Sequence, residues 1–385
     1  MVIQIVNLSY ADVFKRYSSN YNIYRDVFQI GLLGLEIREV PVSLAENIQK
    51  VVLREKEICY KSELKNKKSV NLLIPGSLWD IKDISKRILK KGDEDLGYKI
   101  INVIKNFEEY GTGCFKIGGK DFCFSKSYTM GILNVTPDSF SDGGLYISTA
   151  DAIKHGIGMI KQGADIIDVG GESTRPGSEN VSSEEELKRV LPVIDGILSI
   201  RPEAIISVDT TKKIVAENAL AHGAKIINDI SALTNEPDMG EVIKKHKAAL
   251  VIMHMKGTPK DMQINPYYDD PVKEIYDFLF ERLQKISKFG IKEIFIDPGI
   301  GFGKRVEDNF ELIRRLDDFK SLGYPILIGV SRKSFIGKTL DLQINERDTA
   351  TSLMEALAIK SGARIIRTHN IANGVQVTRL LNHLS

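Results

Sequence analysis

The sequence has little cysteine, little net charge and no long apolar run, and each of these features excludes a class of protein. It holds only 3 cysteines, Cys59, Cys114 and Cys123, whose number is odd and whose spacing is not that of metal ligands. We therefore expect reduced thiols in a reducing compartment rather than a disulfide framework. A formal net charge of +2 gives no reason to expect a nucleic-acid partner. No apolar run approaches the roughly 20 residues of a membrane helix, and no basic region precedes the short apolar stretch at the start. We expect no membrane partner, no signal peptide and a cytoplasmic location.

A repeated pattern begins at Tyr128 and continues to the end of the chain. A short apolar run of strand character ends in a polar residue, and a longer helical stretch follows. The runs are residues 128–134, 164–171, 204–210, 224–230, 248–255, 293–299, 325–331 and 363–370. Their Ile, Val and Leu content without strict alternation is typical of parallel strands buried on both faces. Eight such units predict an α/β fold, a closed (β/α)8 TIM barrel, in preference to an open doubly wound sheet.

The helical stretches between these runs are amphipathic. One of them, SSEEELKRVLPVIDGIL, begins at Ser182. We expect it to open with a capping box from Ser183 to Glu186, because a serine followed three residues later by a glutamate is typical of a helix start.

Polar side chains stand at the end of nearly every apolar run. In a barrel of this type the active site lies at the C-terminal ends of the strands. Those ends carry Asn134, Asp168, Asp209, Asn228, Asp229, His254, Asp297, Ser331, Arg332, Lys333, Arg367 and His369. A single residue of this kind is as readily a loop residue or a helix cap. Capping does not explain polar residues at nearly every strand, so the pattern predicts one convergent polar site.

The carboxylates and amides in this set suit a ring with paired donors. A pterin or a guanine presents a ring N–H beside an amino group, and one carboxylate accepts both donors at once. Asp209 and Asp297, with the amide of Asn228, suit that edge.

The remaining residues suit an anion and a metal ion. Arg367 and His369 stand two apart on one strand, point to the same side and suit a phosphate group. Asn134 and Asp142 offer the oxygen ligands that a hydrated Mg²⁺ prefers. The segment PGIGFGK at 298–304 lacks the G-x-x-x-x-G-K-[ST] spacing of a nucleotide phosphate loop, so we expect no Walker-type site there.

Eight segments together resemble the dihydropteroate synthases, which are pterin-binding enzymes of folate synthesis. They are MGILNVTPDSFSDGG (130–144), DVGGESTRPG (168–177), SVDT (207–210), INDISAL (227–233), MHMKGTP (253–259), DPGIGFGK (297–304), GVSRKSFIG (329–337) and RTHN (367–370). They occur in the family's order. The resemblance implies a transferase that joins 6-hydroxymethyl-7,8-dihydropterin pyrophosphate to p-aminobenzoate and releases pyrophosphate by an SN1-like path.

The resemblance also implies a role for each matching residue. Those for the pterin ring are Asp209, Asn228, Asp297 and Lys333. Those for pyrophosphate are Asn134, Arg367 and His369, and those for the implied cofactor, Mg²⁺, are Asn134 and Asp142. Those for p-aminobenzoate are Phe140, Thr174, Pro176, Ser331 and Arg332. The catalytic residues would be Asp209, Lys333 and Asp142. A homodimer and sensitivity to sulfonamides are typical of the family.

Two alternatives remain open at the level of sequence. A methyltetrahydrofolate-dependent methyltransferase shares the barrel and the ring-binding carboxylates, but it leaves Arg367 and His369 unexplained. A catalytically inactive pterin-binding scaffold would keep the fold, although every role listed above has a candidate residue.

Residues 1–110 lie outside the resemblance. Their pattern predicts a small N-terminal α/β domain of unknown role, and residues 111–385 form the predicted barrel domain. Residues 70–74 are strand-like, and residues 82–91 and 96–107 are helical. The basic run KNKK at 65–68 is interpreted as a solvated loop. The segment FKIGGKDFCF (115–124) predicts a hairpin around two glycines that closes the bottom of the barrel.

Overall fold

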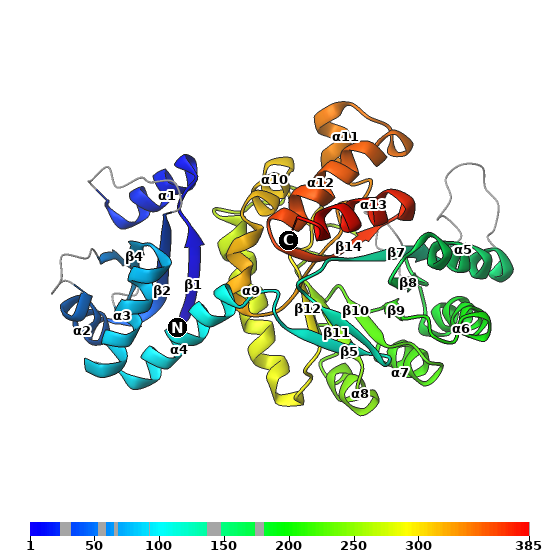
Figure 1. The fold of residues 1–385 in the computed structure, drawn as a ribbon, viewed down its shortest axis with the longest axis horizontal. Helices are drawn as coiled ribbons and strands as arrows, with labels where there is room; N and C mark the ends of the chain where they lie inside the picture. The colour runs from blue at the N-terminus through cyan, green and yellow to red at the C-terminus, as the bar shows by residue number, and fades with distance from the viewer. Residues whose placement is uncertain are drawn as a thin grey trace. The chain divides into compact units, whose positions relative to one another are not determined.

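The structure, a computed structural model, describes residues 1–23, 32–52, 59–64, 68–91, 93–136, 148–173 and 181–384. The chain forms two units, drawn in Figure 1. One consists of Met1–Tyr110 with Asp317–Gly323, and the other of Gly111–Leu316 with Tyr324–Ser385. Among the described residues, no helix is both long and apolar enough to cross a membrane.

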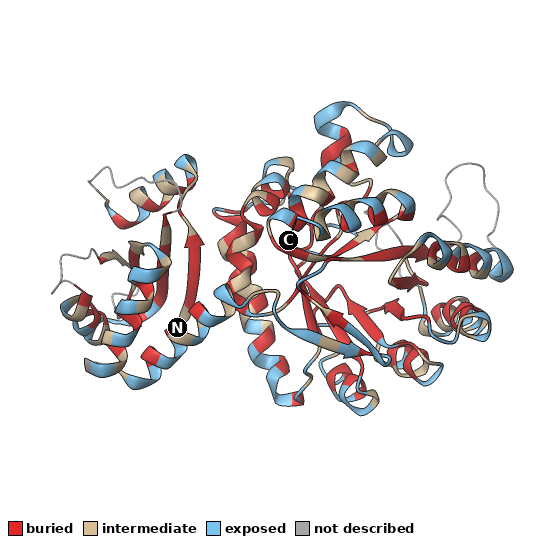
Figure 2. Ribbon diagram, in the orientation of Figure 1, coloured by how far each residue is buried: buried red, intermediate tan, exposed pale blue. Residues whose placement is uncertain are grey.

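The second unit is a closed barrel of parallel strands in the order β10-β11-β12-β13-β14-β7-β8-β9 (Figure 1). The strands are β7 (Tyr128–Asn134), β8 (Ile166–Gly170), β9 (Ile206–Asp209), β10 (Ile226–Asp229), β11 (Ala249–Met253), β12 (Ile294–Asp297), β13 (Ile326–Ile328) and β14 (Ala363–Thr368). Every predicted run contains one of them, so the predicted (β/α)8 barrel is confirmed. Figure 2 shows these strands as buried, in keeping with their apolar composition.

Helices follow the strands and cover the barrel, with their outer faces exposed (Figure 2). They are α5 (Thr149–Gln162), α6 (Ser183–Ile200), α7 (Lys213–Ala221), α8 (Met239–His246), α9 (Pro271–Ile286), α10 (Val306–Arg314), α11 (Ser334–Leu340), α12 (Asp348–Lys360) and α13 (Ile371–Asn382). Short 3-10 turns are η2 (Ser287–Phe289), η3 (Leu316–Leu322) and η4 (Ile344–Glu346). The predicted cap of α6 at Ser183 was wrong by one residue. Ser182 has extended backbone, and its Oγ accepts a hydrogen bond from Glu185 N at 3.2 Å, so the helix begins at Ser183.

The predicted hairpin is present as β5 (Cys114–Ile117) and β6 (Lys120–Cys123), joined by two glycines with positive φ. Its side chains Ile117 and Phe122, with Phe124 just beyond, pack in one buried cluster with residues near the starts of the barrel strands. We call this cluster the plug. Its members on the barrel strands or directly before them are Met130, Ile166, Ile205, Ile226, Ala249, Val251, Phe295, Leu327 and Ile365. The hairpin therefore closes the N-terminal end of the barrel, as predicted.

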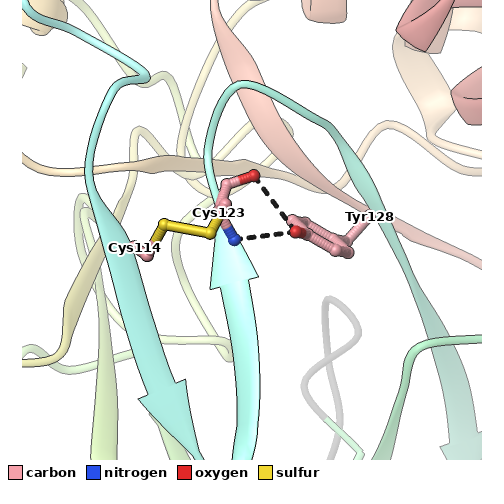
Figure 3. The surroundings of a disulfide bond; sticks show 3 residues. All are labelled: Cys114, Cys123 and Tyr128. Atoms are coloured by element: carbon pink, nitrogen blue, oxygen red, sulfur yellow. Dashed lines mark hydrogen bonds between the residues drawn. A yellow bond between two sulfur atoms is a disulfide. The ribbon is translucent and has the colours of Figure 1, made fainter.

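A disulfide joins Cys114 to Cys123 across this hairpin (Figure 3). The two cysteines face each other in register. Tyr128 Oη accepts a hydrogen bond from Cys123 N at 2.8 Å and donates one to Cys123 O at 3.1 Å. The expectation of reduced thiols was wrong for this pair, because cysteine spacing alone does not show strand register. Cys59 is a free, buried thiol, in agreement with the expectation.

The first unit is an antiparallel sheet in the order β1-β2-β4-β3 with helices packed on it. Its elements are β1 (Val2–Asn7), α1 (Ala11–Tyr21), β2 (Leu33–Pro41), α2 (Val42–Val52), β3 (Tyr60–Glu63), β4 (Ser69–Gly76), α3 (Leu78–Lys91) and α4 (Glu94–Glu108). One apolar cluster joins the sheet to α2, α3 and α4, and another joins it to α1. The predicted strand and both predicted helical stretches fall within β4, α3 and α4. Residues 65–67 of the KNKK run lie outside the described residues.

Segment Asp317–Gly323 belongs to the first unit although it comes from the barrel part of the sequence. Asn7 N donates to Asp318 Oδ1 at 2.9 Å, and Asn7 Nδ2 donates to Asp317 Oδ2 at 3.0 Å. Asn106 Nδ2 donates to Ser321 O at 3.3 Å. These hydrogen bonds tie the segment to both ends of the first unit's sequence.

Candidate functional site

A layer of polar side chains lies directly above the plug. Side chains two residues apart on a strand share a face, so the residue two positions after an inward-facing plug residue also points into the barrel. Ile166, Ile226, Phe295 and Ile365 belong to the plug. The inward positions above them are Asp168, Asn228, Asp297 and Arg367. The barrel geometry therefore collects these residues toward the C-terminal end of the strands, where sequence analysis predicted the site.

Hydrogen bonds connect several members of this layer. Arg367 Nε donates to Asp168 Oδ2 at 2.6 Å, and Arg367 Nη2 donates to Asp209 Oδ2 at 3.0 Å. Asn228 Nδ2 also donates to Asp168 Oδ2, at 3.0 Å. Asp168 is fully buried, and Asp209 and Asn228 are nearly so. Asp168 thus joins Arg367 to Asn228, and Arg367 in turn joins Asp209 to this group.

The two carboxylates predicted for the ring edge have raised pKa values. Burial is the main cause for Asp209, whose pKa rises to about 7 although Arg367 opposes the shift. Burial also raises the pKa of Asp297 to about 6, against a hydrogen bond to its Oδ1 from Gly299 N at 2.7 Å. The tight turn after Asp297 needs a glycine, because a Cβ at Gly299 would stand 1.9 Å from His254 O. Both carboxyl groups therefore change protonation near neutral pH.

Lys333 is the N-cap residue of α11 and lies over an aromatic ring. Its Nζ is 4.1 Å from the centroid of the Phe302 ring. Burial, followed by repulsion from Arg367, lowers the pKa of Lys333 to about 8. Asp297 and Asp209 oppose this lowering, which indicates that Lys333 faces the same carboxylates as Arg367.

The predicted residues after β13 and β14 contact one another or their neighbours. His369 N donates to Ser331 Oγ at 3.1 Å, and His369 Nδ1 lies 3.0 Å from the same oxygen. Arg332 instead forms a two-point ion pair with Asp348, at 2.7 and 3.0 Å. A contact between the Arg332 side chain and the p-aminobenzoate carboxylate would require this pair to open, and it stays a prediction.

Asn134 ends β7 beside a glycine of the next strand. A Cβ at Gly170 would lie 3.3 Å from Asn134 Oδ1, so the glycine leaves room at the amide oxygen. An accessible amide oxygen fits one ligand position of a Mg²⁺ that keeps several waters and binds substrate phosphates. No group of three or more His, Cys, Asp or Glu suited to a metal occurs within the described ranges. Phe140, Asp142, Thr174 and Pro176 lie outside the described residues.

His254, whose role the sequence left open, is buried next to a lysine. Lys304 Nζ lies 3.2 Å from His254 Nδ1, and the His254 ring packs edge-on against Phe278. Burial lowers the pKa of Lys304 to about 7. Lys304 also lines a cavity of about 450 Å³ with Tyr267, and none of the residues predicted to bind substrate lines it. His254 thus contacts Lys304, which lines this cavity, but does not line the cavity itself.

Asp168 was predicted only as the end of a strand, without a role, and Asp348 was not predicted. The signal for Asp168 was its position two residues after Ile166, an inward position. Asp348 had no such signal, because it stands on α12, far along the chain from Arg332. Its carboxylate also accepts a hydrogen bond from Asn370 Nδ2 at 2.9 Å, so it joins the connections that follow β13 and β14.

Comparison with known proteins agrees with this arrangement. The family described as pterin binding enzyme matches residues 130–369. The dihydropteroate synthase of Escherichia coli (strain K12) is 44% identical over 265 residues, which are 68% of this chain and 93% of that protein. The chain belongs to the dihydropteroate synthase family. The resemblance inferred from the sequence segments is confirmed.

Other dihydropteroate synthases are similar to about the same share of the chain. The Bacillus subtilis enzyme is 42% identical over 259 residues, 67% of this chain and 88% of that protein. The Yersinia pestis structure with a sulfonamide drug has a TM-score of 0.67 and 38% identity, covering 71% of this chain and 99% of that one. The Xanthomonas albilineans structure with 7,8-dihydropteroate has a TM-score of 0.63 and 35% identity, covering 71% and 98%. The family match starts at residue 130 and does not include Met1–Tyr110 of the first unit.

Proposed function

We propose that this chain is a dihydropteroate synthase, which joins 6-hydroxymethyl-7,8-dihydropterin pyrophosphate to p-aminobenzoate and releases pyrophosphate. The observation that carries the proposal is the buried layer of Asp209, Asn228 and Asp297 with Arg367 inside the barrel. Solved relatives with 4-aminobenzoic acid and with 7,8-dihydropteroate support these substrates.

The carboxylates of this layer suit the donor edge of the pterin. Gly299 N occupies only part of the accepting capacity of Asp297, because an ionised carboxylate has about four lone-pair sites. The Asn228 side chain keeps one orientation because Asp168 accepts its amide hydrogen. Bound pterin donors favour the ionised form of each carboxylate and so lower the raised pKa values of Asp209 and Asp297.

The same charges suit a dissociative reaction. The bond between the pterin methylene carbon and the pyrophosphate oxygen breaks first, and the electron pair leaves with pyrophosphate. The methylene cation is conjugated to the ring, where Asp209 and Asp297 stabilise its positive charge, while Arg367 stabilises the leaving group. The amine of p-aminobenzoate then forms the carbon–nitrogen bond and loses a proton to water. An arylamine is a weak nucleophile, and it reacts more readily with a cation than with the intact ester.

Mg²⁺ is the proposed cofactor, held by Asn134 Oδ1 and Asp142. When bound, it supplies positive charge that neutralises the departing pyrophosphate. The room that Gly170 leaves beside Asn134 Oδ1 supports this ligand.

A turnover assay tests the function. Purified protein is incubated with both substrates and Mg²⁺, and dihydropteroate and pyrophosphate are measured in equal amounts. Pterin binding without product would identify an inactive pterin-binding scaffold instead. The Asp297→Asn variant is the matched control, because it keeps the shape of the side chain but removes its charge.

A homodimer is also proposed. Large apolar side chains are exposed on neighbouring barrel helices, of which α10 packs against both α11 and α12. They are Phe310, Leu340, Leu353 and Leu357. Exposed apolar side chains grouped in this way are typical of a protein interface. Light scattering should give a dimer for the wild type and a monomer for a Leu353→Glu, Leu357→Glu variant.

We also propose that the protein is located in the cytoplasm. The family relationship to enzymes of bacterial folate synthesis supports it, whereas the Cys114–Cys123 disulfide favours an oxidising environment. Thiol labelling of the protein in intact cells, before lysis, would decide between the two.

A further inference from the structure

Arg332 has a left-handed backbone that is held from the start of α12. Its φ is 56°, a conformation that residues other than glycine rarely adopt and that needs support from surrounding contacts. Arg332 N donates a hydrogen bond to Thr351 Oγ1 at 3.1 Å, and Arg347 Nη1 donates one to Arg332 O at 3.0 Å. The turn between Ser331 and Lys333 therefore depends on α12 for its shape.

Asp348, the first residue of α12, binds side chains from two connections. It accepts both hydrogen bonds of the Arg332 guanidinium, at 2.7 and 3.0 Å, after β13. After β14, Asn370 Nδ2 donates to Asp348 Oδ2 at 2.9 Å. Asn370 is also the N-cap residue of α13, where its Oδ1 accepts a hydrogen bond from Asn373 N at 3.1 Å. One carboxylate thus links the residues that follow Ser331 and His369.

Ser331 and His369 are themselves in contact. Ser331 Oγ accepts hydrogen bonds from His369 N at 3.1 Å and from Thr368 Oγ1 at 3.4 Å, and it lies 3.0 Å from His369 Nδ1. A hydroxyl has two acceptor sites and one hydrogen, so the hydrogen is left for His369 Nδ1. A neutral His369 ring then carries its own hydrogen on Nε2, as a donor suited to a pyrophosphate oxygen.

The Asp348 carboxylate is ionised at neutral pH. The hydrogen bond from Arg332 is the main cause that lowers the pKa of Asp348, while burial opposes the shift. The hydrogen bond from Asn370 and the charges of Arg332 and His369 lower it further. Asp348 therefore forms a full ion pair with Arg332, and its charge reaches His369.

Lys333, which is predicted to bind the pterin, has other contacts of its own. Its backbone N donates to Val330 O at 3.3 Å, and its carbonyl accepts a hydrogen bond from Ile336 N at 3.2 Å, in α11. Its Nζ lies over the Phe302 ring. The position of Lys333 therefore depends less on Asp348 than the contact between Ser331 and His369 does.

We propose that Asp348 is a positioning residue for the pyrophosphate group. By holding Arg332 and Asn370, it keeps the His369 ring on Ser331. The inference rests on the proposed function, because His369 is predicted to bind pyrophosphate. Without the carboxylate, the left-handed turn at Arg332 relaxes and Ser331 moves away from His369. Arg332 then serves this ion pair and not the p-aminobenzoate carboxylate.

Calorimetry with two probes, inorganic pyrophosphate in the presence of Mg²⁺ and 6-hydroxymethylpterin, tests the inference. We expect Asp348→Asn to bind pyrophosphate at least about fivefold more weakly than the wild type, the effect of one lost hydrogen bond, and to bind the pterin equally well. Loss of a negative charge alone would strengthen anion binding, so the expected weakening reports the contacts. Asp341→Asn is the matched control, because Asp341 is exposed at the end of α11 and its replacement removes the same charge. It should behave as the wild type with both probes.

Arg332→Met tests the same ion pair from its other side, and it takes the place of Asp348→Asn if that variant does not fold. The loss of pyrophosphate affinity should equal that of Asp348→Asn, with no further loss in the double variant, because both changes break one ion pair. Additive losses would overturn the inference, since Arg332 would then act on the ligand by itself. A raised KM for p-aminobenzoate in Arg332→Met alone would overturn it as well.

The ring nitrogens of His369 give a readout that needs neither ligand nor turnover. Nitrogen-15 NMR, with the His369 signals assigned from a His369→Gln variant, should show the hydrogen on Nε2 in the wild type and a mixture of tautomers in Asp348→Asn. Unchanged ring signals, or a lower unfolding temperature with unchanged pyrophosphate affinity, would show a purely structural role and overturn the inference. A wild type without turnover would instead refute the proposed function. The affinities and ring signals would still decide the role of Asp348, so the two failures are distinguishable.

Discussion

Glu355 lies on the inner face of α12 with 1% of its surface exposed. Neither of its carboxylate oxygens has a hydrogen-bond partner among the described residues. Burial is the main cause that raises the pKa of Glu355 from its ordinary value of 4.5 to about 7; the nearby Thr368 side chain opposes the rise, and the charge of Asp348 adds to it. The Glu355→Gln variant removes the titrating group while keeping the size of the side chain.

The magnitude follows from proton linkage. In acid the side chain is protonated in the folded and unfolded states alike, and it contributes nothing to the pH dependence. Above about pH 4.5 the unfolded state ionises while the folded state keeps its proton, so stability falls until the pH passes the folded pKa near 7. At 1.36 kcal/mol per pH unit, the total loss is about 3 kcal/mol. Glu355→Gln does not suffer this loss, and its advantage over the wild type should grow by about 3 kcal/mol from pH 4.5 to pH 8.

Urea unfolding followed by circular dichroism across this pH range measures the difference. The comparison with the wild type cancels the titration of all other groups and any constant effect of the new amide. Glu241→Gln on α8 is the control, because Glu241 is exposed and the change should stay within about 0.5 kcal/mol at every pH. A Glu355→Gln difference that does not vary with pH would refute the reasoning and indicate that Glu355 is ionised in the folded protein.

Three further predictions follow from the same structure. Asp297→Asn places an amide donor against a ring donor, which costs about 1–3 kcal/mol, so calorimetry should show pterin binding at least tenfold weaker. In the wild type, pterin affinity should fall as the pH drops through the pKa values of Asp209, about 7, and Asp297, about 6, because a protonated carboxyl no longer accepts both donors. Reducing the Cys114–Cys123 disulfide, whose cysteines are 9 residues apart, should cost about 2–3 kcal/mol of barrel stability in thermal unfolding but leave turnover unchanged.

Each of these predictions has a clear contrary outcome. Wild-type pterin affinity in Asp297→Asn would assign the ring edge to another carboxylate. An affinity that does not change between pH 8 and pH 5 would show that neither carboxylate meets the ring. If reduction leaves the unfolding temperature unchanged, the plug alone holds the hairpin and the disulfide adds nothing.

The barrel was predictable because its signal is local. Each strand is a short apolar run buried on both faces, and the runs repeat with helices between them. The observed strands are shorter than the runs where polar residues follow, as for β13, which is only Ile326–Ile328 within the run 325–331. The strand-end residues Asp209, Asn228 and Asp297 could be grouped as a site because the closed barrel brings all strand ends together.

The partners of these residues were not predictable from the same signal. Arg367 on β14 and Asp168 on β8 meet although β7 lies between their strands. Periodicity along one strand shows which side chains point inward, but it does not show which of them reach each other across the interior. The Cys114–Cys123 pair and the Arg332–Asp348 ion pair depend in the same way on register and on the packing of separate elements. The one-residue shift of the α6 cap has a local cause, since two consecutive serines both fit the capping pattern.

The first unit shows most clearly which contacts could not be predicted from the sequence. The sequence divides the chain near residue 110, and segment Asp317–Gly323 carries no motif that separates it from the barrel around it. The structure nevertheless assigns this segment to the first unit, where Asn7 binds Asp318 from 311 residues away. No residue of the polar layer comes from the segment, because that layer is built on strand ends.

We therefore expect a chain beginning at Gly111 to retain turnover but to lose stability, since Asp317, Asp318 and Ser321 lose three hydrogen bonds, at about 1 kcal/mol each. Hydrogen exchange of Asp317–Gly323 would show the loss directly. A folded but inactive shortened chain would instead give the first unit a part in catalysis that its sequence does not reveal.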